Sequence, residues 1–437
     1  MRTIAIGVLG LGNVGAGALA LLAENRAAIE ARVGATVDVR KVLVRDLHKR
    51  RDVEVDPARL TRDAVAILDD PEIEVVVELI GGIEPARSYV LAALRAGKHV
   101  VTANKALLAE HGDAVFREAR ARGLAVLFEG AVAGGIPILR SLREGLASDR
   151  IEAITGIVNG TSNFILDAMT RDGVSYEAAL AKAQAAGFAE ADPTLDVGGG
   201  DAAHKLALLA QVGFGVRVDP RAIPTEGITA IEPFDIRTAD ELGYVIKSLA
   251  IARRDERGVT LRVHPALVPR GHVLAGVHGS YNACLVESRA LGRSLYYGRG
   301  AGMMPTGVAV VSDIIELCRG IVADAGGERA AVPLQEITPC APLPLDAMEC
   351  ENYLCVLAPN VPGVLGRCAT CLGRHGVSIK RMHQDAPRGP AAVPMVMITE
   401  RVAEQQMAAA LAELATLDVS QATRRLRILD PDPEMGA

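Results

Sequence analysis

The stretch that most constrains the fold of this 437-residue chain is TIAIGVLGLGNVGAGALALLAENR, residues 3–26. An apolar run of strand length is followed by glycines in the spacing G-x-G-x-x-G and then by a helical pattern of leucines. In this context the spacing indicates a dinucleotide-binding turn, because a helix N-terminus offers free N–H groups to a pyrophosphate. The alternative is a glycine-rich turn in another kind of α/β domain. The predicted turn contains Gly10, Gly12, Asn13, Val14 and Gly15.

The same stretch is uncharged from residue 3 to residue 23, so a signal peptide or a membrane span has to be considered. Five glycines and Asn13 make it a poor hydrophobic segment, and the dinucleotide turn explains it better. Seven cysteines, an odd number without a disulfide-style pattern, indicate a reducing compartment. We therefore expect a cytoplasmic protein without a membrane partner. The Cys368-x-x-Cys371 pair has no second pair, so we expect it to pack rather than to bind metal.

The composition excludes a nucleic-acid partner. The net charge is −6, the pI is about 5.9, no basic run is present, and aromatic residues make up 3% of the chain. Half of the residues are hydrophobic, and the length is enough for two or three domains with sizeable cores.

The second predicted strand, Val37 to Val44, bears on the cofactor. A carboxylate at the end of this strand would bind the ribose 2′-hydroxyl of NAD, but here Arg45 comes first and Asp46 follows. Arg45 can pair with a 2′-phosphate, so NADP(H) is favoured, while Asp46 leaves NAD(H) open. A solvated charge cluster is the other interpretation.

Further strand–loop–helix units predict a parallel sheet, whose ligands bind beyond the carboxyl ends of the strands. One strand, Val100 to Thr102, is followed by Asn104 and Lys105, which places Lys105 at such an end. Only eight of the 47 basic residues are lysine, so a lysine at this position is informative, although a salt-bridged surface lysine would look the same.

The acidic stretch GFAEADPTLDVGGGDAAHK, residues 187–205, fits a Ca²⁺ loop, a solvated linker or a site for a small cationic substrate. Its spacing does not fit an EF-hand. Asp201 is a natural N-cap, and Lys205 is four residues further on, so both side chains lie on one face of a helix. A capped helix with a plain ion pair remains the alternative.

With these motifs in place, the chain resembles homoserine dehydrogenases over most of residues 1–320. That family reversibly reduces L-aspartate 4-semialdehyde to L-homoserine with NAD(P)H, on the route to threonine, methionine and isoleucine. GKHVVTANK and NGTSNFIL are more diagnostic than the glycine turn. The matching motifs are GLGNVGAG, VLVRDLHKR, VVELIGG, GKHVVTANKALLA, FEGAVAGGIP, GIVNGTSNFIL, the acidic stretch and GRGAGMMPTG.

The resemblance implies a role for each matching residue. Lys205 would be the catalytic acid/base and Lys105 a second active-site lysine near the nicotinamide, while Glu190 and Asp201, assisted by Asp196, would bind the substrate. Phe188 departs from the family, which usually has tyrosine there. Further implied contacts are Gly187 and Gly302 with the cofactor, and a structural sodium ion with the Glu129 side chain and the carbonyls of Val132, Gly134 and Ile136.

The expected fold is α/β with three parts. Residues 1–130 plus about 302–325 form a Rossmann-type domain, residues 131–301 an α+β substrate and dimerisation domain, and residues 326–348 a linker. Residues 349–430 read strand–helix–strand–strand–helix–strand, which resembles a ferredoxin-like ACT domain and implies regulation, most plausibly by threonine. A purely structural oligomerisation domain is the alternative, and Asn360 stands where an acidic residue is common. We expect a homodimer or a homotetramer.

Two other functions remain open from the sequence. One is a different NAD(P)-dependent dehydrogenase of a small amino acid or aldehyde, which the combination of Lys105, Glu190, Asp201 and Lys205 disfavours. The other is an amino-acid sensor whose Rossmann unit only binds cofactor, which would predict damaged catalytic positions.

Overall fold

The computed structural model describes residues 2–323, 337–384 and 389–430. Residues 326–336 of the predicted linker lie outside this range. The chain divides into two compact units, which are described separately. The N-terminal unit comprises Met1–Gly160, Asp201–Ile223 and Tyr281–Ala341, and the second unit comprises Thr161–Gly200, Pro224–Ser280 and Pro342–Ala437.

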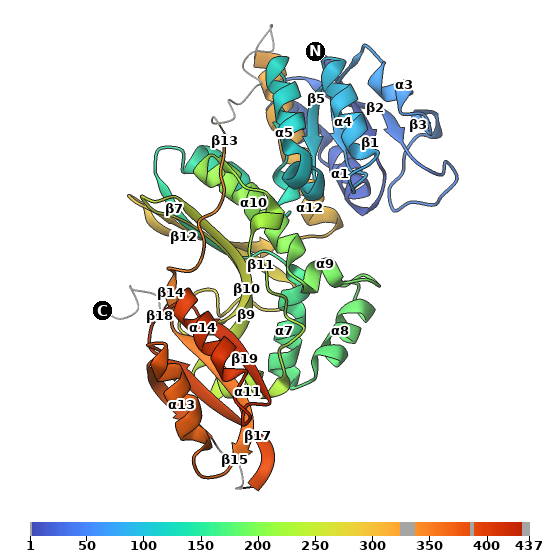
Figure 1. The fold of residues 1–437 in the computed structure, drawn as a ribbon. Coiled ribbons are helices and arrows are strands. Elements are labelled where there is room, and N and C mark those ends of the chain that lie inside the picture. The colour runs from blue at the N-terminus through green and yellow to red at the C-terminus, as the bar shows by residue number, and fades with distance from the viewer. Residues whose placement is uncertain (1, 324–336, 385–388, 431–437) are drawn as a thin grey trace. The chain divides into compact units, whose positions relative to one another are not determined.

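A parallel sheet of six strands forms the centre of the N-terminal unit (Figure 1). Its order is β3-β2-β1-β4-β5-β6, so the chain direction across the sheet reverses beside β1. This order confirms the predicted Rossmann-like sheet. The strand order reverses beside β1, and the glycine-rich turn follows the carboxyl end of that strand. The strands are β1 (Thr3–Leu9), β2 (Thr36–Leu43), β3 (Leu60–Thr61), β4 (Ile73–Glu78), β5 (His99–Thr102) and β6 (Val126–Leu127).

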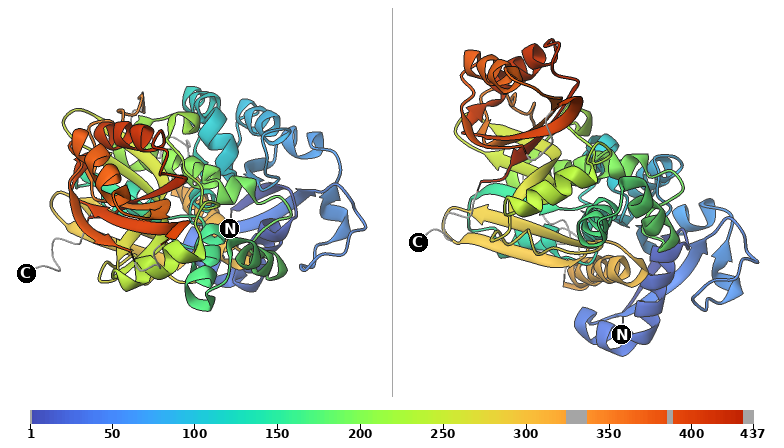
Figure 2. Two further views of the ribbon diagram at one scale, coloured as in Figure 1. Left: turned by 60° about the horizontal axis from the view of Figure 1, so that its bottom comes forward. Right: turned by 90° about the horizontal axis from the view of Figure 1, so that it is seen from below.

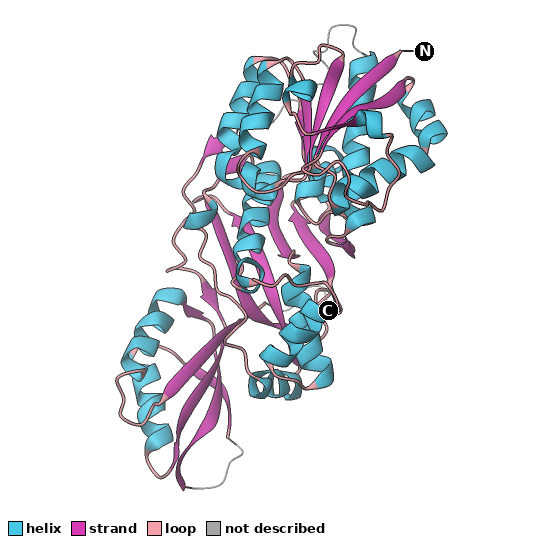
Figure 3. Cartoon of the chain, turned by 90° about the vertical axis from the view of Figure 1, so that its right-hand side faces the viewer, coloured by secondary structure: helices cyan, strands magenta, loops and turns pink. Residues whose placement is uncertain are grey.

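Helices cover both faces of this sheet (Figure 3). The helix predicted near residues 302–325 is present as α12 (Met303–Ala323), and it packs against α1 (Asn13–Glu24). The two helices approach closely because each has a glycine at the crossing, Gly17 and Gly307. The other helices of this unit are α2 (Arg26–Val33), α3 (Val65–Leu68), α4 (Ala86–Arg95), α5 (Lys105–Ala121) and α6 (Ile138–Arg140), with short turns η1 (Pro57–Arg59), η2 (Glu129–Ala131), η3 (Ser141–Gly145) and η4 (Pro220–Ala222).

The N-terminal unit also contains three antiparallel strands in the order β12-β11-β7. They are β7 (Ile151–Ile157), β11 (Tyr281–Ser288) and β12 (Gly292–Arg299). Helix α10 (Gly200–Phe214) packs on β7, where Gly213 lies against Ile154. A parallel pair, β8 (Val216–Arg217) and β13 (Thr338–Pro339), completes the strands of this unit.

The second unit is built on strands in the order β9-β10-β19-β15-β17-β16. Within it, β10 and β19 are parallel, and the other neighbouring strands are antiparallel. The strands are β9 (Tyr244–Arg254), β10 (Val259–Pro269), β15 (Asn352–Asn360), β16 (Ile379–His383), β17 (Gly389–Thr399) and β19 (Ala422–Ile428), and a separate pair is β14 (Glu349–Cys350) with β18 (Val402–Ala403). Its helices are α7 (Gly160–Asp172), α8 (Tyr176–Ala185), α9 (Thr194–Val197), α11 (Pro233–Glu241), α13 (Val364–Arg374) and α14 (Glu404–Leu414).

In the C-terminal part, orange and red in Figure 2, the longer strands and the helices follow the predicted order of strand, helix, strand, strand, helix, strand, and the short strands β14 and β18 are additional. Their sheet has a different core on each face, because successive side chains of a strand point to opposite sides. Leu354 and Val356 pack with α13 and α14, whereas Tyr353 and Cys355 pack with residues of α7 and α11. The pairing of β19 with β10 then extends this sheet into the middle of the chain.

Among the described residues, no helix combines the length and the apolar character that crossing a membrane requires. The cysteines of the C-x-x-C pair, Cys368 and Cys371, are buried in the core between α13 and α14, as expected for packing residues.

The α1–α12 crossing yields a stability test. A Cβ added at Gly17 would lie 2.3 Å from the Met303 carbonyl oxygen, so Gly17→Ala should lower the free energy of unfolding by about 1–3 kcal/mol. A Cβ added at Gly366 in α13 meets nothing within 4 Å, so Gly366→Ala should leave stability unchanged or raise it by up to about 1 kcal/mol. Urea unfolding of both variants checks this, and equal effects would contradict the assigned crossing.

Candidate functional site

Lys105 is positioned by hydrogen bonds at the carboxyl end of β5. The buried Glu78 carboxylate accepts from the Thr102 hydroxyl at 2.6 Å, and that hydroxyl accepts from the Asn104 N–H at 3.0 Å. Asn104 caps α5 by accepting from the Leu107 N–H at 3.1 Å, and its amide donates to the Gly82 carbonyl at 2.6 Å. Lys105 is therefore the first residue of a helix whose start is fixed from two neighbouring strands.

Asp201 and Lys205 lie one turn apart near the start of α10, as the spacing predicted. Lys205 Nζ donates to Asp201 Oδ2 at 2.7 Å and to the Val158 carbonyl at 2.7 Å. Lys105 Nζ lies 3.1 Å from Asp201 Oδ1, and Asn159 Nδ2 donates to Asp201 Oδ2 at 2.8 Å. The structure thus brings Lys105, Asp201 and Lys205 into one cluster.

The charges of this cluster are unevenly exposed. The side chains of Asp201 and Lys205 are 5% and 10% exposed, whereas that of Lys105 is 35% exposed. Burial by itself raises the pKa of Asp201, but the ammonium groups of Lys205 and Lys105, with hydrogen bonds from Lys205 and Asn159, hold that pKa well below its usual range. Asp201 is therefore ionised throughout the neutral range, and one carboxylate faces two ammonium groups.

His204 lies beside the cluster and links α10 to α5. Its Nε2 is 3.6 Å from a carboxylate oxygen of Glu110 on α5. Burial lowers the pKa of His204, while Glu110 and Asp201 oppose that shift. His204 therefore connects the two helices that carry Lys105 and Lys205.

The cluster can donate a proton to a small polar molecule. A lysine ammonium has three N–H bonds, and Lys205 uses two of them in its hydrogen bonds to Val158 and Asp201, so the third has no partner within residues 2–323, 337–384 and 389–430. An ammonium held by a buried carboxylate and a carbonyl is fixed in position, which is what proton transfer to a developing alkoxide requires.

The glycine-rich turn has the geometry of a dinucleotide-binding loop. Gly10 has a φ of 102°, its N–H donates to the Leu43 carbonyl at 3.1 Å, and a Cβ there would lie 2.7 Å from the Leu79 carbonyl oxygen. Gly12 is open, with nothing within 4 Å of an added Cβ, so a phosphate can approach its backbone. Gly15 lies against the Gly10 carbonyl, as helix–strand packing requires.

The other predicted cofactor contacts of this unit flank the turn. Asn13 and Val14 begin α1, Arg45 is exposed just after β2, and Gly302, with a φ of 124°, directly precedes α12.

The residues predicted to hold sodium form a buried turn. Both carboxylate oxygens of Glu129 accept N–H bonds, from Leu139 at 3.0 Å and from Arg140 at 2.8 Å. Burial raises the pKa of Glu129, and these hydrogen bonds lower it in part. The Glu129 N–H donates to Asp313 at 2.8 Å, and burial together with the Glu129 charge raises the pKa of Asp313 well above its usual range. The described residues contain no cluster of three histidine, cysteine or acidic side chains suited to a metal.

The other candidate ligands for a cation in this turn are backbone carbonyl oxygens. Val132, Gly134 and Ile136 follow Glu129 in a buried segment, where Ala133 has a φ of 47°. The Ile136 carbonyl accepts from the Ile138 N–H at 2.8 Å. The donor set is thus a carboxylate and main-chain carbonyls, which suits a hard cation.

Glu190, Asp196 and Gly187 belong to the second unit. Glu190 is exposed, and its carbonyl accepts from the Gln184 side chain at 3.2 Å. Asp196 is half-buried in α9, and its carbonyl accepts from the Ser162 hydroxyl at 3.0 Å. Gly187 has a φ of 75° after α8, which explains the glycine there.

Phe188 packs where the family's tyrosine is expected. Its ring centroid lies 4.7 Å from that of Phe164, and its carbonyl accepts from the Thr161 hydroxyl at 2.6 Å. Its side chain is 42% exposed, so no buried hydroxyl partner is left by the change from tyrosine.

Sequence reasoning missed Asn159 and the Val158 carbonyl as members of the lysine cluster. Both lie just after β7, in the motif GIVNGTSNFIL, to which the resemblance assigned no role. A polar residue at the end of a predicted strand was the available signal, but the partner of that strand end could not be read from the sequence.

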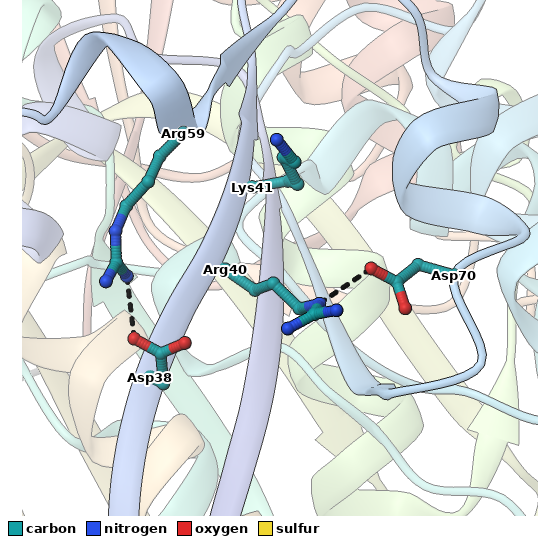
Figure 4. A pocket seen from close by; sticks show the side chains of 5 residues that line it. All are labelled: Asp38, Arg40, Lys41, Arg59 and Asp70. Atoms are coloured by element: carbon teal, nitrogen blue, oxygen red, sulfur yellow. Dashed lines mark hydrogen bonds and ion pairs between the residues drawn. The ribbon is translucent and has the colours of Figure 1, made fainter.

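A charged hollow of about 330 Å³ lies elsewhere on the N-terminal unit, beside β2 (Figure 4). Its charges are already paired: Arg59 lies 2.6 Å from Asp38, and Arg40 lies 2.7 Å from Asp70. Lys41 donates to the Ala58 carbonyl at 3.0 Å. With its cations paired or hydrogen-bonded in this way, the hollow is a poor site for an anion.

Comparison with known proteins supports the interpretation of these motifs. Residues 10–129 match the family model "Homoserine dehydrogenase, NAD binding domain", and residues 137–315 match the model "Homoserine dehydrogenase". The homoserine dehydrogenase of Pseudomonas aeruginosa is 43% identical over 432 residues, which cover 98% of this chain and 99% of that protein.

Solved structures give the same result. A homoserine dehydrogenase from Thiobacillus denitrificans has a TM-score of 0.90 and 43% identity, covering 98% of this chain and 99% of that one. A hyperthermophilic archaeal homoserine dehydrogenase in complex with NADPH has a TM-score of 0.60 and 25% identity, covering 72% of this chain and 97% of that one.

The buried cluster predicts a large effect of Asp201→Asn on stability. Without the carboxylate the two ammonium groups lose their counter-charge, so the free energy of unfolding at pH 7 should fall by about 3 kcal/mol. The folded-state pKa of Asp201 is lowered, so its contribution is present above the unfolded pKa, about 4, and is lost as pH falls below that value.

Urea unfolding at pH 7 and at pH 3 measures both effects. The difference between parent and variant should shrink at pH 3. The exposed Glu152 on β7 gives a matched control, since Glu152→Gln should change stability by less than about 0.5 kcal/mol. A variant as stable as the parent at pH 7 would show that Asp201 does not hold the cluster together.

Proposed function

The chain belongs to the homoserine dehydrogenase family, and from this premise we propose that Lys205 is the proton donor and acceptor of the reaction and that Lys105 and Asp201 complete its catalytic cluster. The enzyme is an NAD(P)-dependent oxidoreductase acting on L-homoserine or L-aspartate 4-semialdehyde. The observation that carries the assignment of roles is the buried contact of Asp201 with both lysines.

The cluster suits the proton transfer that this reaction needs. The nicotinamide supplies or takes the hydride when it is bound. Reduction of the aldehyde turns its oxygen into an alkoxide, and the third N–H of Lys205 is placed to donate a proton to that oxygen. In the reverse direction a neutral Lys205 accepts the hydroxyl proton. Lys105⁺, which shares Asp201, adds a second positive charge that stabilises the developing negative charge.

We also propose that carboxylates bind the α-ammonium group of the substrate. Glu190 is supported by its exposed position after the Gly187 turn, and Asp196 by its place just before the helix that carries Asp201. A rise in KM for L-homoserine with little change in KM for cofactor in Glu190→Gln is the measurement that supports this role.

A structural sodium ion and a preference for NADP(H) complete the proposed site. Sodium is supported by the oxygen donors of Glu129, Val132, Gly134 and Ile136, and a lower Tm in choline chloride than in sodium chloride would test it. NADP(H) is supported by the exposed Arg45 after β2 and by the NADPH bound to the archaeal relative.

We propose that the C-terminal strands and helices, residues 349–430, form an ACT domain. Threonine would bind this domain and inhibit the enzyme. The element order and the sheet order β19-β15-β17-β16 support this assignment. Turnover that threonine does not suppress would leave these elements with an assembly role.

We further propose a homodimer or a homotetramer in the cytoplasm. Strand β12 ends its row of strands and exposes Leu295 and Tyr297, which fits an edge that a second copy covers. The seven unpaired cysteines fit a reducing compartment. Light scattering after size exclusion measures the oligomeric state.

The proposed acid/base role predicts a selective loss of chemistry. Lys205→Met should lower kcat for L-homoserine oxidation by about 10³-fold, because it removes the proton acceptor. The Kd for NADP⁺, measured by fluorescence titration, should change by less than about twofold. Lys182→Met on α8, where Lys182 is 48% exposed, is the matched control and should keep full turnover. Loss of cofactor binding together with turnover would indicate misfolding and remove the basis for the role.

The proposed cofactor preference predicts a selective effect at Arg45. Removing its guanidinium should raise KM for NADP⁺ by about 10-fold or more, because a charge-assisted contact with the 2′-phosphate is lost, while KM for NAD⁺ stays within about twofold. Steady-state kinetics of Arg45→Ala with both cofactors checks this. Arg50→Ala, at another exposed arginine of the same loop, is the control. Equal effects of Arg45→Ala on both cofactors would rule out a 2′-phosphate contact.

A further inference from the structure

Arg427, in β19, is a buried arginine that pairs with two carboxylates, the mostly buried Glu404 and the half-exposed Glu226. Its Nη1 lies 2.7 Å from Glu226 Oε1, and its Nη2 lies 2.6 Å from Glu404 Oε1. The Arg427 side chain is 9% exposed, and its Nε also donates to Glu404 Oε2 at 3.2 Å. A planar guanidinium with a fixed fork can hold two carboxylates at once.

Glu226 stands in a short segment, residues 224–228, that is fixed to β10. The Glu226 N–H donates to the Val263 carbonyl at 2.8 Å, and the Val263 N–H donates to the Pro224 carbonyl at 2.9 Å. Arg427 itself is paired with Ala266 of β10 through its backbone. The main chain of the segment is therefore bonded to β10, and its Glu226 side chain is paired with Arg427 of β19.

The other side of this segment contacts the turn before α10. The Ile228 N–H donates to the Val197 carbonyl at 2.9 Å. A Cβ added at Gly227 would lie 2.6 Å from that carbonyl oxygen, and one added at Gly199 would lie 2.7 Å from Thr225 Cγ2. Contacts this close leave no room for the turn to shift unless residues 224–228 shift with it.

The turn leads directly into Asp201. Gly200 is the first residue of α10 and Asp201 is the second, so one peptide bond joins the turn to the residue that carries the carboxylate. An error of about 1 Å at a catalytic group costs a large factor in rate or affinity.

We propose that Arg427 is a positioning residue for the reaction: through Glu226 and the 224–228 segment it holds the turn that sets Asp201. This rests on the proposed role of Asp201 in the catalytic cluster. Arg427 is more than 200 positions from Asp201 in the sequence, and it touches neither substrate nor cofactor in this scheme. The C-terminal strands thereby contribute to catalysis without any effector.

The test compares Arg427→Met and Glu226→Gln with Arg425→Met. Arg425 also pairs with Glu404, at 2.7 Å, but the structure gives it no contact with Glu226, so it is a matched control for damage to the packing of α14 on β19. We expect Arg427→Met to raise KM for L-homoserine by about tenfold, in the range of typical coupling effects, with KM for NADP⁺ within about twofold. Arg425→Met should leave KM for L-homoserine within about twofold.

Two further variants separate positioning from folding. Arg427→Lys should recover only part of the affinity, because an ammonium is a point charge and does not bridge two carboxylates in fixed geometry. The double variant Arg427→Met/Glu226→Gln should have the KM of the worse single variant, since both act through one contact. If the two substitutions instead raise KM independently, so that their factors multiply in the double variant, the proposed action through one contact is wrong.

Each outcome has a defined meaning. If the wild-type enzyme turns over L-homoserine and Arg427→Met has the same KM, the positioning role is wrong and the proposed function stands. The same rise of KM in Arg425→Met as in Arg427→Met also overturns it, because the effect then comes from general loosening. A wild-type enzyme that binds NADP⁺ but does not turn over L-homoserine refutes the proposed function instead.

Discussion

The buried contact of the Asp201 carboxylate with two lysine ammonium groups is the interaction on which the polar part of this fold depends. It joins three elements that are far apart in the sequence: the start of α5, the end of β7 and the start of α10. A buried carboxylate is stable only when it is paired and hydrogen-bonded, and Asp201 has both kinds of partner. The same contact leaves an excess of positive charge in the cluster that we propose as catalytic, so one carboxylate would serve both stability and chemistry.

Lysine and arginine are divided between two tasks in this chain. Lysine is rare, eight of 47 basic residues, and two of the eight, Lys105 and Lys205, form the cluster in which we propose that a proton moves. Lysine is suited to this because burial can bring its pKa toward neutrality, as it does for Lys247, whose pKa is lowered to about 8. Arginine stays charged, its planar guanidinium can hold two carboxylates, and arginines form the ion pairs along β19. Arg424 binds Asp235, and Arg425 and Arg427 bind Glu404.

Local patterns predicted local structure well. The glycine spacing after an apolar run gave the Rossmann-like sheet and its turn, and the four-residue spacing of Asp201 and Lys205 gave their contact. The approach of Lys105 to Asp201 could not follow from spacing, because 96 positions separate them and only the packing of α5 beside α10 closes that distance. Asn159 was missed for the same reason. The roles of Glu190 and Asp196 came from resemblance alone.

The C-terminal strands show the limit most clearly. The order strand, helix, strand, strand, helix, strand was visible in the sequence, and it describes a four-stranded sheet with two free edges. Nothing in the pattern of β19 shows that its edge pairs with β10, because main-chain hydrogen bonds carry no side-chain signature. The pairing joins Ala266 to Arg427 and Leu267 to Ile428 through their backbones. The buried arginines of β19 stand at that junction, where Arg427 pairs with Glu404 of α14 and with Glu226 of the segment bonded to β10.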